Sequence, residues 1–160
     1  MNLNEANEIA LNLMGEYGLT LQGWTFSFDS SKRRFGSCQG ATSRITLSRT
    51  LTELNSLERV RLTILHEIAH ALTPGENHSR KWRRKLLEIG GNGERCFTAA
   101  NTICVPSSFK GTCPSCGTEI PAFKRRRVAC SSCCRKHNFG KFDSRFLFVW
   151  TRNNPSIKEG

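Results

Sequence analysis

The sequence lacks the segments that direct a protein into or across a membrane. Residues 1–8 have neither a basic start nor an apolar segment, so they do not form a secretory signal. No apolar run approaches the roughly 18 residues that a membrane helix needs. We therefore expect an intracellular protein with no membrane partner, located in the cytoplasm, at the nucleoid if it is bacterial or in the nucleus if it is eukaryotic.

Acidic residues are scarce relative to basic ones. The 160 residues include 13 Asp and Glu against 24 Lys and Arg, which leaves a formal net charge of +11. This excess indicates a polyanionic partner, most often nucleic acid, although a basic surface that meets only solvent would have the same composition. Internal repeats are lacking too, and the length allows one catalytic domain with a small module but not two full-sized domains.

Residues 57–72 combine helical periodicity with the pattern His-Glu-x-x-His. His66 and His70 are one turn apart on one helix face, where two imidazoles can hold one metal ion. Glu67 points away from that pair, which suits a carboxylate that takes a proton from a metal-bound water and does not bind the metal. The apolar residues of the opposite face are Leu57, Val60, Ile64, Ile68 and Ala71. The pattern predicts a helix that buries one side and presents a catalytic zinc site to a cleft.

A catalytic zinc ion usually has three protein ligands, so a third ligand should follow in the chain. Turn residues end the helix at 57–72, and the pattern of residues 79–89 predicts another helix. His78 is the favoured third ligand, because a histidine at a helix start needs little rearrangement to return to the first two. Glu88, a carboxylate further downstream, and Glu76, in the loop itself, are the alternatives.

The residues before the metal-site helix predict a small α+β domain. Helical spacing predicts a helix over residues 3–16. Alternating apolar and polar residues predict three short strands, at residues 24–29, 34–38 and 44–48. We expect the first two strands to form an antiparallel hairpin, and Asn55 with Glu58 to form a capping box before the metal-site helix. The predicted fold is zincin-like, with helices packed on a small antiparallel sheet.

An edge strand of this sheet could hold a substrate. It could pair with an extended peptide by main-chain hydrogen bonds and place the scissile bond over the metal, with little demand on the side-chain sequence. Alternatively, the basic residues 32–34 only blunt the edge.

Four cysteines form two C-x2-C pairs separated by thirteen residues. They are Cys113, Cys116, Cys130 and Cys133. Each pair supplies two thiolates from a tight turn, and four thiolates complete a tetrahedral site with no open position, which is typical of structural zinc. Cys134 is the alternative to Cys133 as the last ligand. We expect a small β zinc ribbon at residues 106–152 with a last strand at 146–150, followed by a tail at 153–160.

Basic residues surround the second cysteine pair. They are Lys124, Arg125, Arg126, Arg127, Arg135 and Lys136. Phe123, Phe139 and Phe142 lie among them, and this combination suits phosphate contacts together with base stacking. A solvated hairpin tip would have the same composition. We expect these residues to bind nucleic acid.

The motifs together resemble a known family. The metal-site pattern runs from His66-Glu67-x-x-His70-Ala71-Leu72-Thr73-Pro74 to His78 and Trp82, and it follows Gly36-Ser37-Cys38 and Ile45-Thr46-Leu47-Ser48. In these motifs the chain resembles the SprT and Spartan family of zinc metalloproteases over residues 3–150. The cysteine module resembles the zinc ribbon that follows the protease domain in SprT-type members. It departs from their pattern in continuing Cys133-Cys134-Arg135, where Cys-Gly is usual.

The resemblance implies a protease domain at residues 1–105. It also implies that His66, His70 and His78 bind the catalytic zinc and that Glu67 is the catalytic base. Spartan-type members degrade proteins covalently trapped on DNA and are activated by DNA, so the resemblance implies the same substrates here.

These inferences predict a monomeric zinc endopeptidase with one catalytic and one structural zinc ion. Its expected partners are single- or double-stranded DNA and the proteins bound or crosslinked to that DNA. A first alternative is a nucleic-acid-binding or transcription-associated regulator whose metal cleft is weakly active or inactive. A second is a zinc amidase or peptidase unconnected with nucleic acid, which would show no salt-dependent affinity for DNA.

Overall fold

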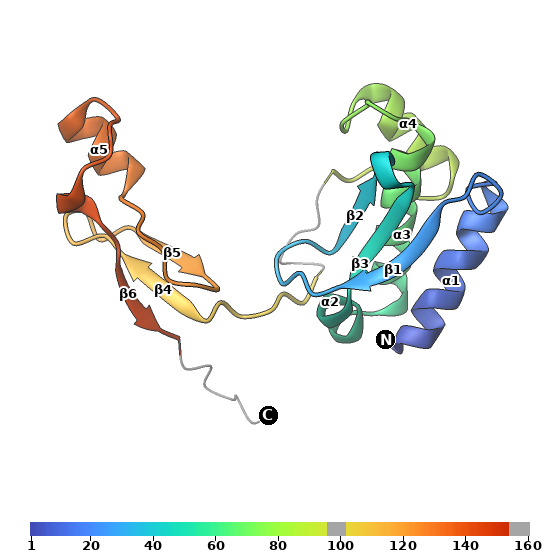
Figure 1. Ribbon diagram of the computed structural model, residues 1–160, viewed down its shortest axis with the longest axis horizontal. Coiled ribbons are helices and arrows are strands. Elements are labelled where there is room, and N and C mark those ends of the chain that lie inside the picture. The colour runs from blue at the N-terminus through green and yellow to red at the C-terminus, as the bar shows by residue number, and fades with distance from the viewer. Residues whose placement is uncertain (96–101, 154–160) are drawn as a thin grey trace. The chain divides into compact units, whose positions relative to one another are not determined.

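The computed structural model describes residues 1–95 and 102–153 and divides into two compact units, Met1–Val105 and Pro106–Gly160. Figure 1 shows the elements of each unit. The predicted tail at 153–160 lies outside the described residues except for Asn153. None of the described helices has the length and apolar character needed to cross a bilayer.

The first unit places helices around a three-stranded sheet. Its elements are α1 (Leu3–Glu16), β1 (Thr25–Asp29), β2 (Gly36–Gln39), β3 (Arg44–Ser48), α2 (Arg49–Leu54), α3 (Leu57–Leu72) and α4 (Arg80–Glu88). This confirms the predicted α+β class, the first helix and the metal-site helix. Helix α2 was not expected from the sequence.

The strand order of the first sheet differs from the prediction. It is β1-β3-β2, with β1 parallel and β2 antiparallel to β3, so the predicted hairpin and the antiparallel sheet are wrong. Strand β3 is the most buried of the three, with every residue after Arg44 buried, and it therefore takes the central place. Alternation in a sequence shows which residues face the core, but it does not show which strands are neighbours.

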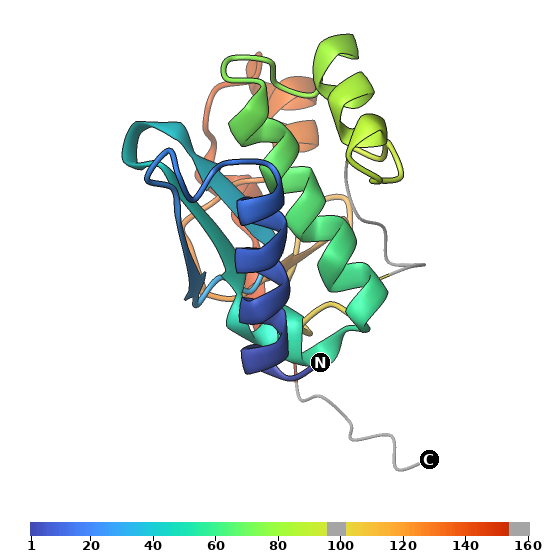
Figure 2. The ribbon, with the colours of Figure 1, turned by 90° about the vertical axis from the view of Figure 1, so that its right-hand side faces the viewer.

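Helix α3 is the centre of the first unit. It packs against α1, α4, β2 and β3, and Figure 2 shows α1 and α3 side by side. Val60, Ile64 and Ile68 are fully buried between these elements, as their spacing predicts, whereas Leu57 at the first turn is 47 % exposed. The opposite face of the helix remains available for polar residues.

The start of α3 lies one residue later than the predicted capping box. Ser56 is the N-cap, and its Oγ accepts a hydrogen bond of 3.3 Å from the backbone N–H of Arg59. Asn55 is buried instead, and its amide nitrogen donates to the carbonyls of Leu51 and Ile103. A buried amide needs such partners, so Asn55 joins the end of α2 to the segment at residue 103 and does not cap a helix.

The second unit is a small antiparallel sheet with one helix. Its elements are β4 (Phe109–Thr112), β5 (Glu119–Ala122), α5 (Ser131–Asn138) and β6 (Val149–Arg152), and the strand order is β5-β4-β6. The last strand starts three residues later than predicted, because Ser144–Phe146 forms a 3-10 turn that buries Phe146. The small buried core contains Cys113, Cys130, Cys133, Cys134, Phe146 and Phe148.

Candidate functional site

Three histidines from the first unit converge on one point. The Nε2 atom of His78 lies 3.2 Å from the Nε2 atom of His70 and 3.2 Å from that of His66. Two imidazole nitrogens bound at about 2.05 Å to one tetrahedral zinc ion would be about 3.3 Å apart. The three side chains therefore have the right spacing to bind one zinc ion.

Helix geometry and a strained loop bring these rings together. His66 and His70 are one turn apart on α3, while His78 lies in the loop before α4 with φ of +49°. This left-handed conformation is unfavourable for a residue with a Cβ atom, so the surrounding contacts must hold it. Ser79 provides two of them, since its Oγ accepts from the backbone N–H of Trp82 and donates to the Glu76 carboxylate at 2.6 Å.

The rival third ligands are engaged elsewhere. Glu76 accepts the hydrogen bond from Ser79 and lies 3.5 Å from the Nζ atom of Lys81, and Glu88 pairs with Lys85 at 2.7 Å. Within the part of the chain that the structure describes, the group of possible ligands at this point contains neither glutamate.

Trp82 forms the floor beneath the three imidazoles. Its side chain is completely buried, and its ring centroid lies 4.8 Å from that of His66, 5.1 Å from that of His70 and 4.6 Å from that of His78. Because one rigid side chain touches all three rings, it limits the orientations that each can take. The sequence showed Trp82 only as part of a family motif.

The protonation state of the histidines suits metal binding. Burial, with repulsion from the neighbouring histidines, lowers the pKa of His66 to about 3 and that of His70 to about 4. Burial and the charge of Arg95 also lower the pKa of His78. His66 further forms a hydrogen bond with the backbone of Glu94, the kind of contact that fixes the tautomer of a metal-binding histidine. Neutral imidazoles keep a lone pair for a metal.

Glu67 is buried beside the histidines and outside the ligand group. Burial raises the pKa of its carboxyl to about 8, against the opposing effects of the Arg34 charge and the backbone N–H of Cys38. A Cβ atom at Gly36 would lie 2.6 Å from Oε1 of Glu67, so β2 packs directly on this carboxylate. A cation bound by the histidines would favour the charged form of Glu67.

Residues 6–103 match the family model described as the SprT-like family, a stretch that includes the three histidines and Glu67. The chain belongs to the SprT-like family. The match confirms the resemblance seen in the sequence and indicates a metalloprotease type of function for the first unit. None of the curated proteins compared with the chain matches it.

The SprT-like unit has a cleft in front of the histidines. Its volume is about 720 Å³, within the range of about 300–1,000 Å³ that is usual for ligand sites. Strand β2 lines one wall, with Gly36 and Cys38 facing the cleft, and one face of α3 lines another. The backbone N–H of Ser48 in β3 donates to the Phe35 carbonyl. Because backbone groups alternate in direction along an antiparallel pair, those of Gly36 and Cys38 lie on the side of β2 away from β3.

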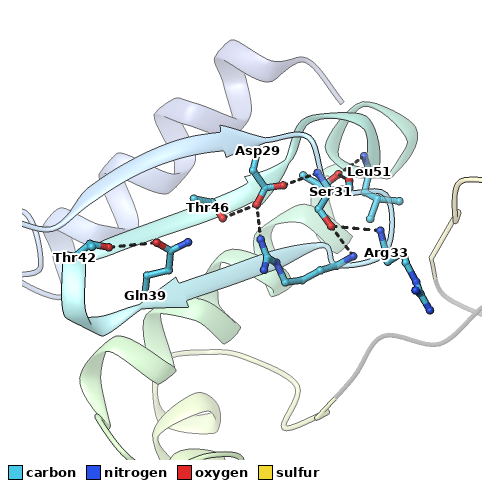
Figure 3. A network of polar contacts seen from close by, with 9 residues as sticks. Asp29, Ser31, Arg33, Gln39, Thr42, Thr46 and Leu51 are labelled. Carbon is cyan, nitrogen blue, oxygen red and sulfur yellow. Dashed lines mark hydrogen bonds and ion pairs between the residues drawn. The ribbon is translucent and has the colours of Figure 1, made fainter. Parts of the chain in front are cut away.

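A polar network holds the loop that leads into β2. The Asp29 carboxylate accepts hydrogen bonds from Thr46 Oγ1 at 2.8 Å, Arg34 at 2.8 Å and the backbone N–H of Ser31 at 2.9 Å. Figure 3 shows Asp29 directed at Thr46 and Ser31. Although partial burial opposes it, these bonds keep the pKa of Asp29 below its usual value. Asp29 was not expected as a functional residue from the sequence, where its only signal was its place at the end of a strand.

The second unit brings four thiols together. Cys113 Sγ lies 3.8 Å from Cys133 Sγ, and Cys116 Sγ lies 3.7 Å from Cys130 Sγ. Two sulfurs bound at about 2.3 Å to one tetrahedral zinc ion would be about 3.8 Å apart, so this group could also bind zinc. Cys134 is buried and lies outside the group found among the described residues.

The basic residues of the second unit are accessible. Lys124, Arg125, Arg126, Arg127, Arg135 and Lys136 are all exposed. The Arg125 guanidinium lies 5.5 Å from the ring centroid of Phe109, and that of Arg127 lies 5.8 Å from the ring centroid of Phe142. Phe139 is 97 % exposed and Phe142 is 56 % exposed. Cations and open aromatic faces therefore occur on the same small unit.

Proposed function

We propose that this SprT-like protein is a zinc-dependent endopeptidase with a zincin-like catalytic domain. The observation that carries the proposal is the spacing of His66, His70 and His78 around one point, next to a buried carboxylate in the wall of a cleft. Bound there, zinc would act as a Lewis acid toward the scissile carbonyl and lower the pKa of a coordinated water towards about 7.

In this proposal the chain's own groups move the proton and hold the substrate. Glu67 takes a proton from the attacking water and later delivers it to the leaving amine. Strand β2 binds the substrate as an added strand through the backbone groups of Gly36 and the carbonyl of Cys38, which face away from β3. The backbone N–H of Cys38 is already bonded to the Glu67 carboxylate. Main-chain pairing of this kind would make cleavage depend little on the substrate's side chains.

The second unit is proposed to be a zinc ribbon with a structural zinc ion on Cys113, Cys116, Cys130 and Cys133. Four thiolates leave no open position for a substrate. The unit buries few apolar side chains, so metal binding would supply a large part of its folding free energy. The predicted total is therefore two zinc ions, one catalytic and one structural.

The proposed substrates are proteins bound or crosslinked to DNA. The exposed cations of the second unit would contact phosphates, and Phe139 and Phe142 would stack on bases. Binding to DNA would bring the protease to its substrate, so position would decide what is cut. The net charge of +11 supports a polyanionic partner.

Zinc content tests the catalytic site. The wild-type protein should contain two zinc ions per chain, and His78→Ala should contain one and should cleave no protein substrate, because two imidazoles hold zinc weakly. Elemental analysis of the purified proteins gives the zinc content, and gel analysis of a protein tethered to DNA gives the cleavage. Glu88→Ala is the matched control, since it removes the rival ligand from α4 and should keep both zinc ions. If Glu88→Ala lost a zinc ion and His78→Ala kept both, the proposed ligand set would be wrong.

Charge reversal in the second unit tests the role of DNA. Replacing Lys124, Arg125, Arg126 and Arg127 by Glu should weaken DNA binding at least about tenfold and reduce its salt dependence. Cleavage of a DNA-tethered protein should fall in parallel, while cleavage of the same protein without DNA should not change. Fluorescence anisotropy and gel assays measure the two effects. If wild type binds DNA and cleaves neither substrate, the exposed basic and aromatic surface favours the alternative, a nucleic-acid-binding regulator.

A further inference from the structure

The cleft contains a cation that the proposed hydrolysis does not use. Arg59 lies on α3 seven residues before His66, and Thr63 lies between them on the same face. Seven residues of α-helix rise about 10 Å, so Arg59 lies about 10 Å from His66 along the helix axis.

Arg59 is mostly buried and poorly bonded for a guanidinium. Its side chain is only 11 % exposed, and its Nε atom has no hydrogen-bond partner in residues 1–95 and 102–153. Its Nη2 atom donates to Thr63 Oγ1 at 3.4 Å, and Nη1 lies 3.9 Å from the Glu94 carboxylate, which is beyond hydrogen-bonding distance. A buried charge normally has closer partners, because each unmade hydrogen bond to it costs free energy. Burial lowers the pKa of Arg59, as expected for a charge in such a place.

The other charges around the cleft indicate which anion would fit. Arg34 already pairs with Asp29 at 2.8 Å, so its charge is largely neutralised. Arg95 is a third arginine in the cleft lining. Glu67, Glu76 and Glu94 line the same cleft, and these three carboxylates would repel a chain of phosphates. A single carboxylate on an otherwise neutral peptide avoids most of this repulsion and can form paired hydrogen bonds with a guanidinium.

We propose that Arg59 forms a binding subsite for an acidic side chain of the substrate. The proposal rests on the proposed function in one respect, namely that a peptide lies extended along the cleft. An extended chain advances about 3.3 Å per residue, so the bound Asp or Glu would lie about three residues from the scissile bond. Main-chain pairing along β2 would allow several registers of the peptide. Arg59 would favour the register that places an acidic residue beside it.

Peptide binding to the full-length, zinc-loaded Glu67→Gln protein tests the proposal. The probes are short fluorescent peptides with amidated C-termini, in which a single Glu is moved along a chain of otherwise neutral residues. The peptide with Glu at one particular position should bind about tenfold more tightly than the matched peptide with Gln there, as measured by fluorescence anisotropy. Adding Arg59→Gln should remove this difference. Arg61→Gln, which changes an exposed arginine of the same helix, should leave it intact.

Three outcomes would overturn the subsite. The first is that no position of Glu is favoured, and the second is that the Arg59 and Arg61 variants lose the preference for Glu equally. The third is that single-stranded DNA displaces the acidic peptide from the wild-type side chain at position 59 but not from Arg59→Gln. Arg59→Lys guards against a folding defect, because it keeps the charge and should retain part of the preference. If the acidic peptide binds through Arg59 and wild type never cleaves it, the subsite stands while the proposed hydrolysis fails.

Discussion

Replacing Glu67 by Gln should slow cleavage of a DNA-tethered protein by about 100-fold to 10,000-fold, the range that a positioned general base contributes. The amide has nearly the same shape as the carboxylate but cannot accept a proton from water. Glu67 is only 7 % exposed, so no bulk base can easily take its place. Initial rates of cleavage, measured by gel densitometry at matched protein concentrations, give the effect.

The zinc content of this variant separates a catalytic role from a structural one. Glu67 lies outside the group of His66, His70 and His78, so the Gln variant should still contain two zinc ions and should bind DNA with unchanged affinity. Cleavage at the wild-type rate would reject Glu67 as the base. A loss of zinc along with activity would mean that the carboxylate maintains the metal site and would leave its part in proton transfer unsupported.

A methyl group at position 36 should also impair cleavage strongly. In Gly36→Ala the new Cβ atom would lie 2.6 Å from Oε1, 2.8 Å from Cγ and 3.0 Å from Cδ of Glu67. Strand β2 is hydrogen-bonded to β3 and cannot easily retreat, so the carboxylate must move. A displacement of about 1 Å in a catalytic group can reduce the rate about 100-fold, and we expect a loss of that order.

Gly40→Ala is the matched control for this prediction. Gly40 also lines the cleft, at the 3-10 turn after β2, and no described atom lies within 4 Å of the position that its Cβ would occupy. It should therefore keep the wild-type rate, and both variants should keep two zinc ions. If Gly36→Ala cleaves as fast as Gly40→Ala, the contact between β2 and Glu67 does not control the position of the base.

The two predictions concern different parts of one arrangement. Glu67 supplies the chemical group, and Gly36 allows a strand to pack against it. The raised pKa of Glu67, about 8, follows from this packing, because burial favours the neutral acid. The same contact that would orient the base therefore also removes it from water. This explains why a residue with no side chain can matter as much as a residue that would move a proton.

Much of the candidate site could be predicted because it depends on local geometry. His66 and His70 meet because residues four apart share a helix face, and the hydrophobic spacing of residues 57–72 predicts that helix. The cysteine pairs meet for a similar reason, since two-residue gaps form tight turns. Turn residues and the following helix also favoured His78, but only the structure shows how it reaches the other two.

The remaining features depend on contacts between segments that are distant in the sequence. The position of His78 requires its left-handed backbone and the floor provided by Trp82. The central place of β3 reflects its burial among neighbours that alternation cannot reveal. The N-cap of α3 is one residue later than predicted, because the Asn55 side chain is buried and donates to the carbonyls of Leu51 and Ile103.

The sequence by itself determined the metal-binding residue types, the helix that presents two histidines and the family of the chain, because spacing within a few residues sets each of them. Only the tertiary structure decided that Gly36 packs on Glu67, that Arg59 lies mostly buried in the cleft with few partners, and that β2 is an edge strand. These features arise from the packing of separate elements, and packing depends on the shape of the whole unit and not on any single stretch of the chain.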